Sequence, residues 1–186
     1  KQRDSVGLSV FDSKVRAYFP PRSSMGIILE IDRLLRQTHA APKSSIAQQL
    51  YDTAILMKRR SMVILISDLF ADTEDILRGL DHLRFAGHNV IVFQMLDPYE
   101  LEFPFKGAWR FEGLEEEEPL TTQPERIRED YLKSFNSYLD NLRAGCIASN
   151  VDYTLVDTSV PLDAVLGEFM DRRASAFAGS SAGARQ

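Results

Sequence analysis

The chain has 186 residues, a net charge of −5 at pH 7 and 44% hydrophobic residues, which predicts one domain with a substantial core. The acidic balance argues against nucleic acid or an anionic membrane as the main partner, because phosphate binding requires clustered Lys and Arg. No apolar stretch approaches the roughly 20 residues that span a bilayer. The single cysteine, Cys146, excludes an intrachain disulfide and favours a reducing compartment, which we expect to be the cytoplasm.

The first third of the chain predicts a hairpin followed by two helices. Apolar residues alternate on both sides of the turn at Asp12-Ser13, which is typical of two antiparallel strands. Apolar residues then recur at helical spacing, and the serines before each run are suitable caps. The first helix has Ile27, Ile28, Ile31, Leu34 and Leu35 on one face, and the second, capped by Ser44 or Ser45, has Ile46, Leu50, Ala54 and Met57.

The segment over residues 62–70 is the most informative in the chain. Five apolar residues end in Ser67-Asp68, and a helix signal follows almost at once. A run this short and this apolar is typical of a strand buried on both faces in a parallel sheet between helices. Asp68 then lies at the carboxyl end of the strand, where open α/β sheets bind ligands. A carboxylate there is a suitable ligand for a hard cation.

Strands and helices alternate through the rest of the chain. Asp72-Thr73 begins a helix that ends at Gly87, and a buried strand over residues 90–93 leads to Asp97-Pro98. Residues 97–122 are expected to be irregular, with Trp109 and Phe111 in a short strand or a hairpin arm. The remaining elements are a long helix opened by Pro124, a strand over 151–156 and a helix after Pro161.

This alternation predicts an α/β fold: a doubly wound, mostly parallel sheet with one antiparallel edge hairpin. We expect a domain over residues 1–172 and a flexible tail of Ala, Ser and Gly over 173–186.

Five phrases, in order along the chain, resemble a bacterial family that has a domain-of-unknown-function label and a von Willebrand factor A-like fold. They are DSVGLSVFDSKVRAYFPP, RRSMVILISDLF, LRFAGHNVIVFQMLDPYELEFPF, PERIREDYLKSFNSYLDNL and VDYTLVDTSVPLDAVL. The resemblance covers residues 3–172. It implies association with MoxR-type AAA+ ATPases, which members of the family often accompany.

The resemblance also implies a metal-ion-dependent adhesion site at the carboxyl edge of the sheet. Asp68 matches the Asp that follows a strand, and Ser44 best matches the Thr that opens a helix, with Ser45 as a rival. The third part, an Asp-x-Ser-x-Ser loop, occurs nowhere in the sequence. Two oxygens cannot satisfy a cation that takes six. We therefore expect Mg²⁺ or Mn²⁺ in the full-length protein and none in this chain.

The same resemblance implies that a first strand and helix are lacking. The strand would lie between the Val6 strand and the residue 62–67 strand, so its absence would leave unpaired backbone groups and an apolar slot. We expect that residues upstream of Lys1 belong to a longer protein, or that another chain fills the slot. A homodimer through the exposed sheet edge is one expected form.

The resulting functional expectation is a non-enzymatic protein-binding domain, an adaptor or chaperone-like partner of a MoxR-type AAA+ ATPase with a remnant metal site. The alternative is a magnesium-dependent hydrolase or phosphatase that uses Asp68 as ligand or nucleophile. That enzyme would need a second carboxylate near Asp68, and Asp97 is the visible candidate. However, Asp-Pro more often starts a turn.

Other candidate residues favour ordinary structural roles. His39, His82 and His88 are too dispersed for a metal cluster, and a surface position is expected for His82 and His88. Cys146 falls on an apolar helix stripe and is expected to be a buried, inert thiol. The acidic run at residues 115–118 is expected to be a solvated loop. The aromatic segment over 99–109 either covers the sheet edge or forms an exposed binding patch.

Overall fold

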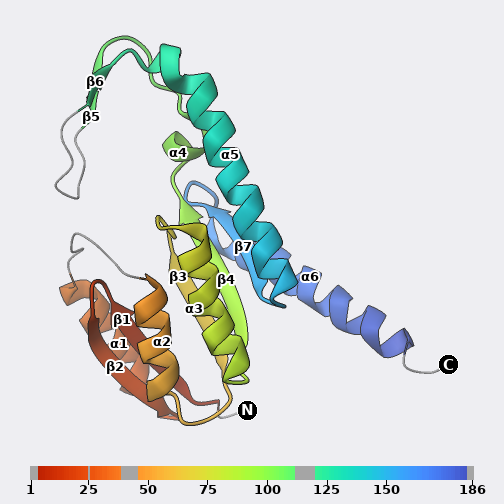
Figure 1. Ribbon diagram of the computed structural model, residues 1–186. Coiled ribbons are helices and arrows are strands. Elements are labelled where there is room, and N and C mark those ends of the chain that lie inside the picture. Colours follow the sequence, from red (N-terminus) through yellow and green to blue (C-terminus); the bar gives the residue numbers. More distant parts are fainter. Residues whose placement is uncertain (1–3, 25, 39–45, 112–119, 184–186) are drawn as a thin grey trace.

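Three parallel strands form the centre of the protein. The computed structural model describes residues 4–24, 26–38, 46–111 and 120–183, with side chains described up to residue 175. The strands β3 (Met62–Ser67), β4 (Asn89–Leu96) and β7 (Asp152–Asp157) pair in the order β3-β4-β7 (Figure 1). Helices flank this sheet, and an antiparallel hairpin forms a separate sheet. The predicted doubly wound α/β class is therefore confirmed.

Helices cover the sheet on two faces because β4 is apolar on both. Val90 and Val92 face α3 (Thr73–Phe85) and α5 (Pro124–Ala148), whereas Ile91 and Phe93 face α6 (Leu162–Gly183). The α2 helix (Ile46–Leu56) packs against α3 on the first face. Gly79 permits this contact, since a Cβ there would lie 2.9 Å from Leu50 Cδ1. The larger core therefore lies between the sheet and α2, α3 and α5.

The β3 strand is packed on one face only, which corrects the prediction that it is buried on both. Leu65 is 5% exposed and belongs to the larger core, but Met62, Ile64 and Ile66 are 60%, 49% and 65% exposed. The physical reason is the position of α6, whose Phe169 packs on β4 and β7. Among the described residues, nothing equivalent covers the same face of β3.

The α1 helix (Gly26–Gln37) also differs from expectation. Of its predicted inward-facing residues only Ile27 is buried, whereas Ile28 and Leu35 are more than half exposed. The amphipathic pattern of α1 is therefore present in the sequence, but in the described part of the chain much of its apolar face has no cover.

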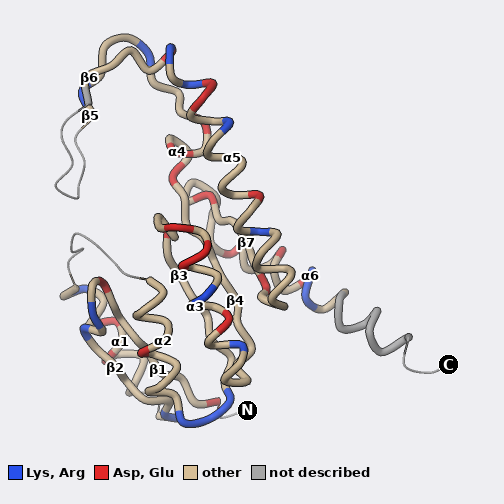
Figure 2. Tube along the Cα trace, viewed as in Figure 1, with Lys and Arg blue, Asp and Glu red and all other residues tan. Residues whose placement is uncertain are grey.

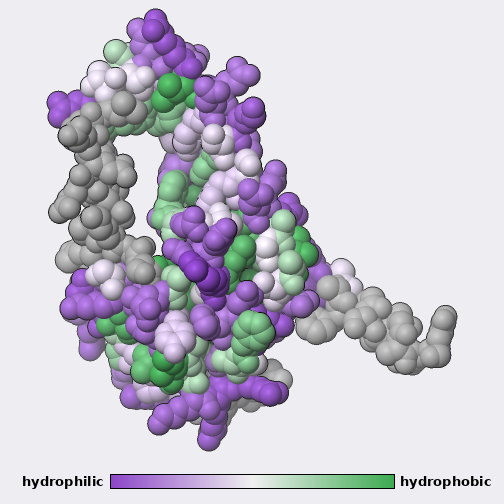
Figure 3. Space-filling model, viewed as in Figure 1, coloured by the Kyte–Doolittle hydropathy of each residue, from purple (hydrophilic) through white to green (hydrophobic). Residues whose placement is uncertain are grey.

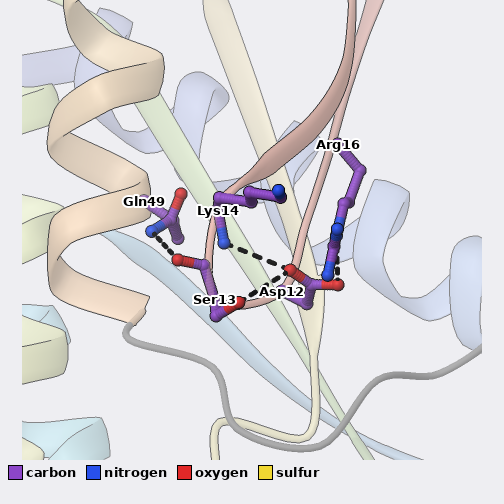
Figure 4. Close-up of polar contacts among 5 residues, drawn as sticks. All are labelled: Asp12, Ser13, Lys14, Arg16 and Gln49. Carbon is purple, nitrogen blue, oxygen red and sulfur yellow. Dashed lines mark hydrogen bonds and ion pairs between the residues drawn. The ribbon is translucent and has the colours of Figure 1, made fainter.

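The predicted hairpin is confirmed and forms its own two-stranded sheet. β1 (Val6–Phe11) pairs antiparallel with β2 (Val15–Arg22), and neither pairs with β3 among the described residues. The Asp12 carboxylate holds the turn by accepting bonds from Lys14 N and Arg16 Nε, and Gln49 Nε2 of α2 donates to the Ser13 carbonyl at 3.0 Å (Figure 4). The hairpin is thus attached to α2.

Residues 97–122 contain the predicted strand or hairpin arm at Trp109 and Phe111, and they are otherwise more regular than predicted. They contain a short helix, α4 (Pro98–Glu102), and two paired strands, β5 (Trp109–Phe111) and β6 (Leu120–Thr122). We call residues 98–111 and 120–122, which include α4, β5 and β6, the aromatic arm, and this arm lies beside the amino-terminal half of α5 (Figure 1). The acidic run at residues 115–118 and the chain ends at 1–3 and 184–186 lie outside the described residues. The backbone of α6 continues to Gly183, and a flexible tail over 173–186 stays a prediction.

The aromatic arm is held together by rings that contact one another and α5. Phe103, in a left-handed conformation with φ +45°, stacks on Tyr131 of α5 with 4.4 Å between ring centroids. Phe105 contacts both Trp109 and Phe111. The outer side of α5 in this view is mostly hydrophilic (Figure 3). The arm therefore packs onto α5 and does not pair with the three-stranded sheet.

His88, predicted to lie at the surface, is only 1% exposed. It precedes β4, its Nδ1 accepts a hydrogen bond from Ser61 N at 3.2 Å, and its burial lowers its pKa below 6.5. The sequence does not indicate this partner, because Ser61 precedes β3 and lies 27 residues from His88 along the chain. Cys146 is buried as predicted. None of the helices in the described ranges has the length and apolar character needed to span a bilayer.

The burial of His88 predicts a stability loss in mild acid. Its folded pKa lies below the unfolded value of 6.5, so the unfolded chain binds the proton first as the pH falls. The contribution is fully present above 6.5 and is lost at up to about 1.4 kcal/mol per pH unit until the folded pKa is reached. Urea unfolding between pH 7.5 and pH 5.5 measures this loss.

Two variants control this prediction. His88→Asn retains an acceptor for Ser61 N but does not titrate, so its stability should vary less with pH than that of the wild type. His82→Asn replaces an exposed histidine and should keep the full dependence. Equal slopes in wild type and His88→Asn would contradict this role of His88.

Candidate functional site

The loop that follows β3, residues 67–71, lies at the carboxyl edge of the parallel sheet and is called the rim loop. Leu69 adopts a left-handed conformation with φ +59° and is 1% exposed, so its side chain anchors the loop in the core. Asp68 Oδ1 accepts a hydrogen bond from Phe70 N at 3.3 Å, and Ser67 Oγ accepts one from Leu69 N at 3.1 Å. These local bonds leave the Asp68 carboxylate and the Phe70 ring exposed on either side of Leu69.

Buried polar side chains hold the backbone of the rim loop. Gln94 of β4 is fully buried, and its Nε2 donates to the Asp68 carbonyl at 2.9 Å. Tyr153 of β7 donates its hydroxyl to Gln94 Oε1 at 2.5 Å. Tyr138 of α5 donates to the Leu69 carbonyl. Three elements of the core therefore determine where the loop sits.

The two tyrosines remain protonated donors at neutral pH. Burial, together with the nearby Asp68 carboxylate, raises the pKa of Tyr138 to about 12. Burial also raises the pKa of Tyr153. Since neither hydroxyl ionises near pH 7, both hydrogen bonds persist across the physiological range.

A row of aromatic rings connects the rim loop with the aromatic arm. Phe70 stacks on Phe135 of α5 with 6.2 Å between centroids, and Phe135 stacks on Tyr131 at 5.5 Å. Tyr131 in turn stacks on Phe103 of the arm. Phe70 is 60% exposed although it belongs to this row, so it presents a ring that is fixed on one side and open to a partner on the other.

The other carboxylates at this edge of the sheet serve the backbone. Asp97, at the end of β4, accepts from Tyr99 N at 2.8 Å within a capping box with Glu100. Asp157, at the end of β7, accepts from both Ser159 N and Ser159 Oγ, which lowers its pKa. Asp97 thus caps the short helix α4, whereas the sequence predicted that it starts a turn. Neither residue joins Asp68 in a cluster of three metal-ligating side chains in the described part of the chain.

The expected metal site has one described ligand, Asp68. Ser44, like its rival Ser45, lies outside the described residues. A hard divalent cation takes about six oxygen ligands, and the described ranges offer no group of three or more His, Cys, Asp or Glu that would hold one. The described residues therefore do not by themselves fit Mg²⁺ or Mn²⁺, and we assign no chemistry to a bound ion.

One open hollow of about 410 Å³ lies elsewhere, between α2 and α3. The side chains in it already interact with one another: Asp75 pairs with Arg78, and the Tyr51 ring contacts His82 edge to face at 5.0 Å. It therefore lacks the convergent free polar groups typical of a small-molecule site.

Sequence reasoning found Asp68 but missed the residues that position it. Gln94 is the one polar residue inside the apolar run of β4, and that was a usable signal, because a buried amide requires partners. Tyr138 recurs at helical spacing with the apolar residues of α5, and nothing in the sequence indicates that its hydroxyl bonds to the carbonyl of residue 69. Nothing in the sequence pattern distinguishes Phe70 from a residue of the core.

Comparison with families of known proteins gives a match. Residues 1–138 match the family described as "Protein of unknown function DUF58". No curated protein and no solved structure matches the chain. The matched region includes the hairpin, the first two strands of the parallel sheet, the rim loop and more than half of α5.

Replacing Gln94 tests the anchoring of the rim loop. Gln94→Met keeps the volume but removes both hydrogen bonds, leaving the Asp68 carbonyl and the Tyr153 hydroxyl without their partner. We expect a loss of roughly 1–3 kcal/mol in the free energy of unfolding. Tyr153→Phe removes one bond and should cost about 1 kcal/mol. In the double variant the losses should be less than additive, as measured by urea denaturation. Full additivity would show that the two side chains do not act together.

Proposed function

Because the chain belongs to the DUF58 family of proteins of unknown function, which supplies no activity to transfer, we propose a function from the rim loop itself: a non-enzymatic protein-binding domain. The observation that carries the proposal is the exposed pair of Asp68 and Phe70 on a loop fixed by Gln94, Tyr138 and Tyr153. A charge and an aromatic ring held in place by buried bonds lose little entropy when a partner binds.

The chemistry of the pair defines the surface of the partner. The Asp68 carboxylate favours a Lys or Arg, and the open side of the Phe70 ring favours an apolar or guanidinium group stacked upon it. Aromatic residues at the centre of an interface commonly contribute much of its binding energy. The partner surface is thus basic and apolar, and in this chain the contact needs no metal ion.

We further propose that this partner is a MoxR-type AAA+ ATPase and that the domain serves as its adaptor or chaperone-like companion. The support is the order of the five sequence phrases, which resemble a family with a von Willebrand factor A-like fold found beside such ATPases. The parallel strand order and the position of Asp68 after β3 are compatible with that fold. A cytoplasmic location belongs to the same proposal and is supported by the single, buried cysteine.

A binding role agrees with the rim better than the hydrolase or phosphatase alternative. That alternative requires a second carboxylate beside Asp68, and Asp97 is engaged by the first turn of α4. The described residues offer no further candidate cluster. A screen of the protein with magnesium against phosphate esters separates the two functions: turnover that is lost in Asp68→Asn would favour the enzyme.

The binding proposal predicts a specific pattern among variants. Asp68→Asn keeps the acceptor for Phe70 N but removes the charge, and Phe70→Ala removes the ring. We expect each to weaken capture of a MoxR-type ATPase by roughly tenfold, as measured by surface plasmon resonance with immobilised ATPase.

Matched controls come from exposed residues elsewhere. Asp140→Asn removes a charge from the outer surface of α5, and Phe85→Ala removes a ring that is 88% exposed at the end of α3. Both should bind like the wild type. If all four variants bind equally, the rim loop is not the contact surface.

A further inference from the structure

The aromatic arm presents two rings to solvent. Phe105 lies at its centre, with 5.5 Å between its ring centroid and that of Tyr99 and 5.0 Å between its centroid and that of Trp109. Tyr99 and Trp109 are nevertheless 58% and 44% exposed. Neighbouring exposed rings are typical of binding surfaces. Of the two alternatives that the sequence allows for residues 99–109, these rings form the exposed patch.

Hydrogen bonds from α5 fix the backbone on one side of these rings. Arg128 donates to the carbonyls of Glu102 and Phe103, at 2.8 and 3.2 Å. Tyr131 donates its hydroxyl to the Glu100 carbonyl at 3.0 Å. The end of α4 is therefore attached to a long helix. A ring that is held in place before binding loses little entropy when a partner stacks on it.

The turn that leads to Trp109 is fixed in a similar way. Gly107, with φ +82°, donates its N–H to Glu125 Oε1 at 2.6 Å, and this bond lowers the pKa of Glu125. The indole Nε1 of Trp109 donates to the Lys106 carbonyl at 2.9 Å. Since the indole N–H is already bonded, the exposed part of Trp109 can be recognised through its ring face and not through a hydrogen bond.

The arm lies in the most acidic part of the chain. Residues 97–131 contain eleven acidic and four basic side chains, a net charge of −7, whereas the whole chain has −5. Figure 2 shows acidic positions in α4 and along the amino-terminal half of α5. Because the rest of the chain is slightly positive, the negative field is concentrated around the arm and favours a cation there. The acidic residues of this segment that the structure describes are Asp97, Glu100, Glu102, Glu125, Glu129 and Asp130.

Ring faces in an acidic field favour arginine as the occupant. A cation over the face of Trp or Tyr is attracted by the ring quadrupole. A guanidinium group is planar and more weakly hydrated than an ammonium group, so arginine stacks on such faces better than lysine does. An anionic ligand would be repelled by the surrounding carboxylates, and a neutral proline-rich segment would gain nothing from them.

The distances between the rings limit the spacing of the arginines. The centroids of Tyr99 and Trp109 are at most about 10.5 Å apart, because their distances to Phe105 are 5.5 and 5.0 Å. An extended chain advances roughly 3.3 Å per residue. Two arginines that are two or three positions apart in an extended segment can therefore reach both rings.

We propose that the aromatic arm binds an extended segment of a partner protein in which two arginines, two or three positions apart, stack on Tyr99 and Trp109. The carboxylates around the arm supply the complementary charge. This surface goes beyond the contact proposed for the rim loop and does not depend on it, because Phe135 and Tyr131 lie between Phe70 and the arm in the row of rings.

Three labelled peptides test the proposal on the natural full-length protein. The probe has two arginines three positions apart in a Gly-Ser background, and fluorescence anisotropy at low salt measures its binding. In the second peptide citrulline replaces both arginines, which keeps their shape and removes their charge. The third is neutral and rich in proline. We expect both controls to bind at least roughly tenfold more weakly than the arginine peptide, and added salt to weaken the arginine peptide further.

Protein variants locate the binding site. Tyr99→Leu and Trp109→Leu keep an apolar side chain but remove a ring, and each should weaken the arginine peptide roughly fivefold. Trp109→Phe restores a ring and should recover part of the loss, which a merely unfolded arm would not do. Tyr51→Leu is the control, since it removes a ring that is 42% exposed on α2. Phe70→Ala should leave peptide binding unchanged, which separates this surface from the rim-loop contact.

Four results would overturn the proposal. Equal affinity for the arginine and citrulline peptides would mean that charge is not recognised. Tighter binding of the proline-rich peptide would assign the rings to an uncharged partner. Binding of the arginine peptide that survives both leucine substitutions would place the contact on carboxylates away from the rings. Absence of binding of the arginine peptide at low salt would mean that the arm does not take up arginine.

Discussion

The packing of β3 against the core determines how this chain presents Asp68 and Phe70 to a partner. Leu65 and Val63 turn one face of the strand into the core beneath α3, and that packing leaves Met62, Ile64 and Ile66 on the other face. The same strand ends at the rim loop, so the placement of β3 also places Asp68 and Phe70. The position of the rim loop therefore depends on the packing of one face of β3.

The rim loop shows how a small polar network can fix a surface in an apolar core. Gln94 would be costly in β4 if its amide had no partners, but it bonds to a backbone carbonyl of the loop and to Tyr153. Burial keeps Tyr138 and Tyr153 protonated, so both act only as donors here. The row from Phe70 through Phe135 and Tyr131 to Phe103 then connects this loop with the aromatic arm. The aromatic arm and the rim loop are thus joined by ring contacts that run along α5, so a change in the position of one is transmitted to the other.

Local signals in the sequence identified most elements, and tertiary context decided the rest. Asp72 was predicted to start α3, and its carboxylate does accept bonds from Glu74 N and Asp75 N. The helix stripe that contains Cys146 is buried as predicted, and Phe135 and Leu142 of α5 are buried with it. The apolar run predicted that β3 is a strand, but it did not predict that only one face of the strand is buried. Periodicity does not report which helices cover a strand. His88 and Gln94 were missed as buried polar residues because their partners, Ser61 and the Asp68 carbonyl, are 27 and 26 residues away in sequence.

The central claim is that the hydrogen bonds of Gln94 and Tyr138 fix the rim loop, so that Asp68 and Phe70 are presented in one arrangement. NMR relaxation of the backbone amides in the rim loop tests it most directly. The account predicts order parameters for residues 68–70 as high as those of β4, and lower values in Gln94→Met. Order parameters typical of a flexible loop in the wild-type protein would contradict it.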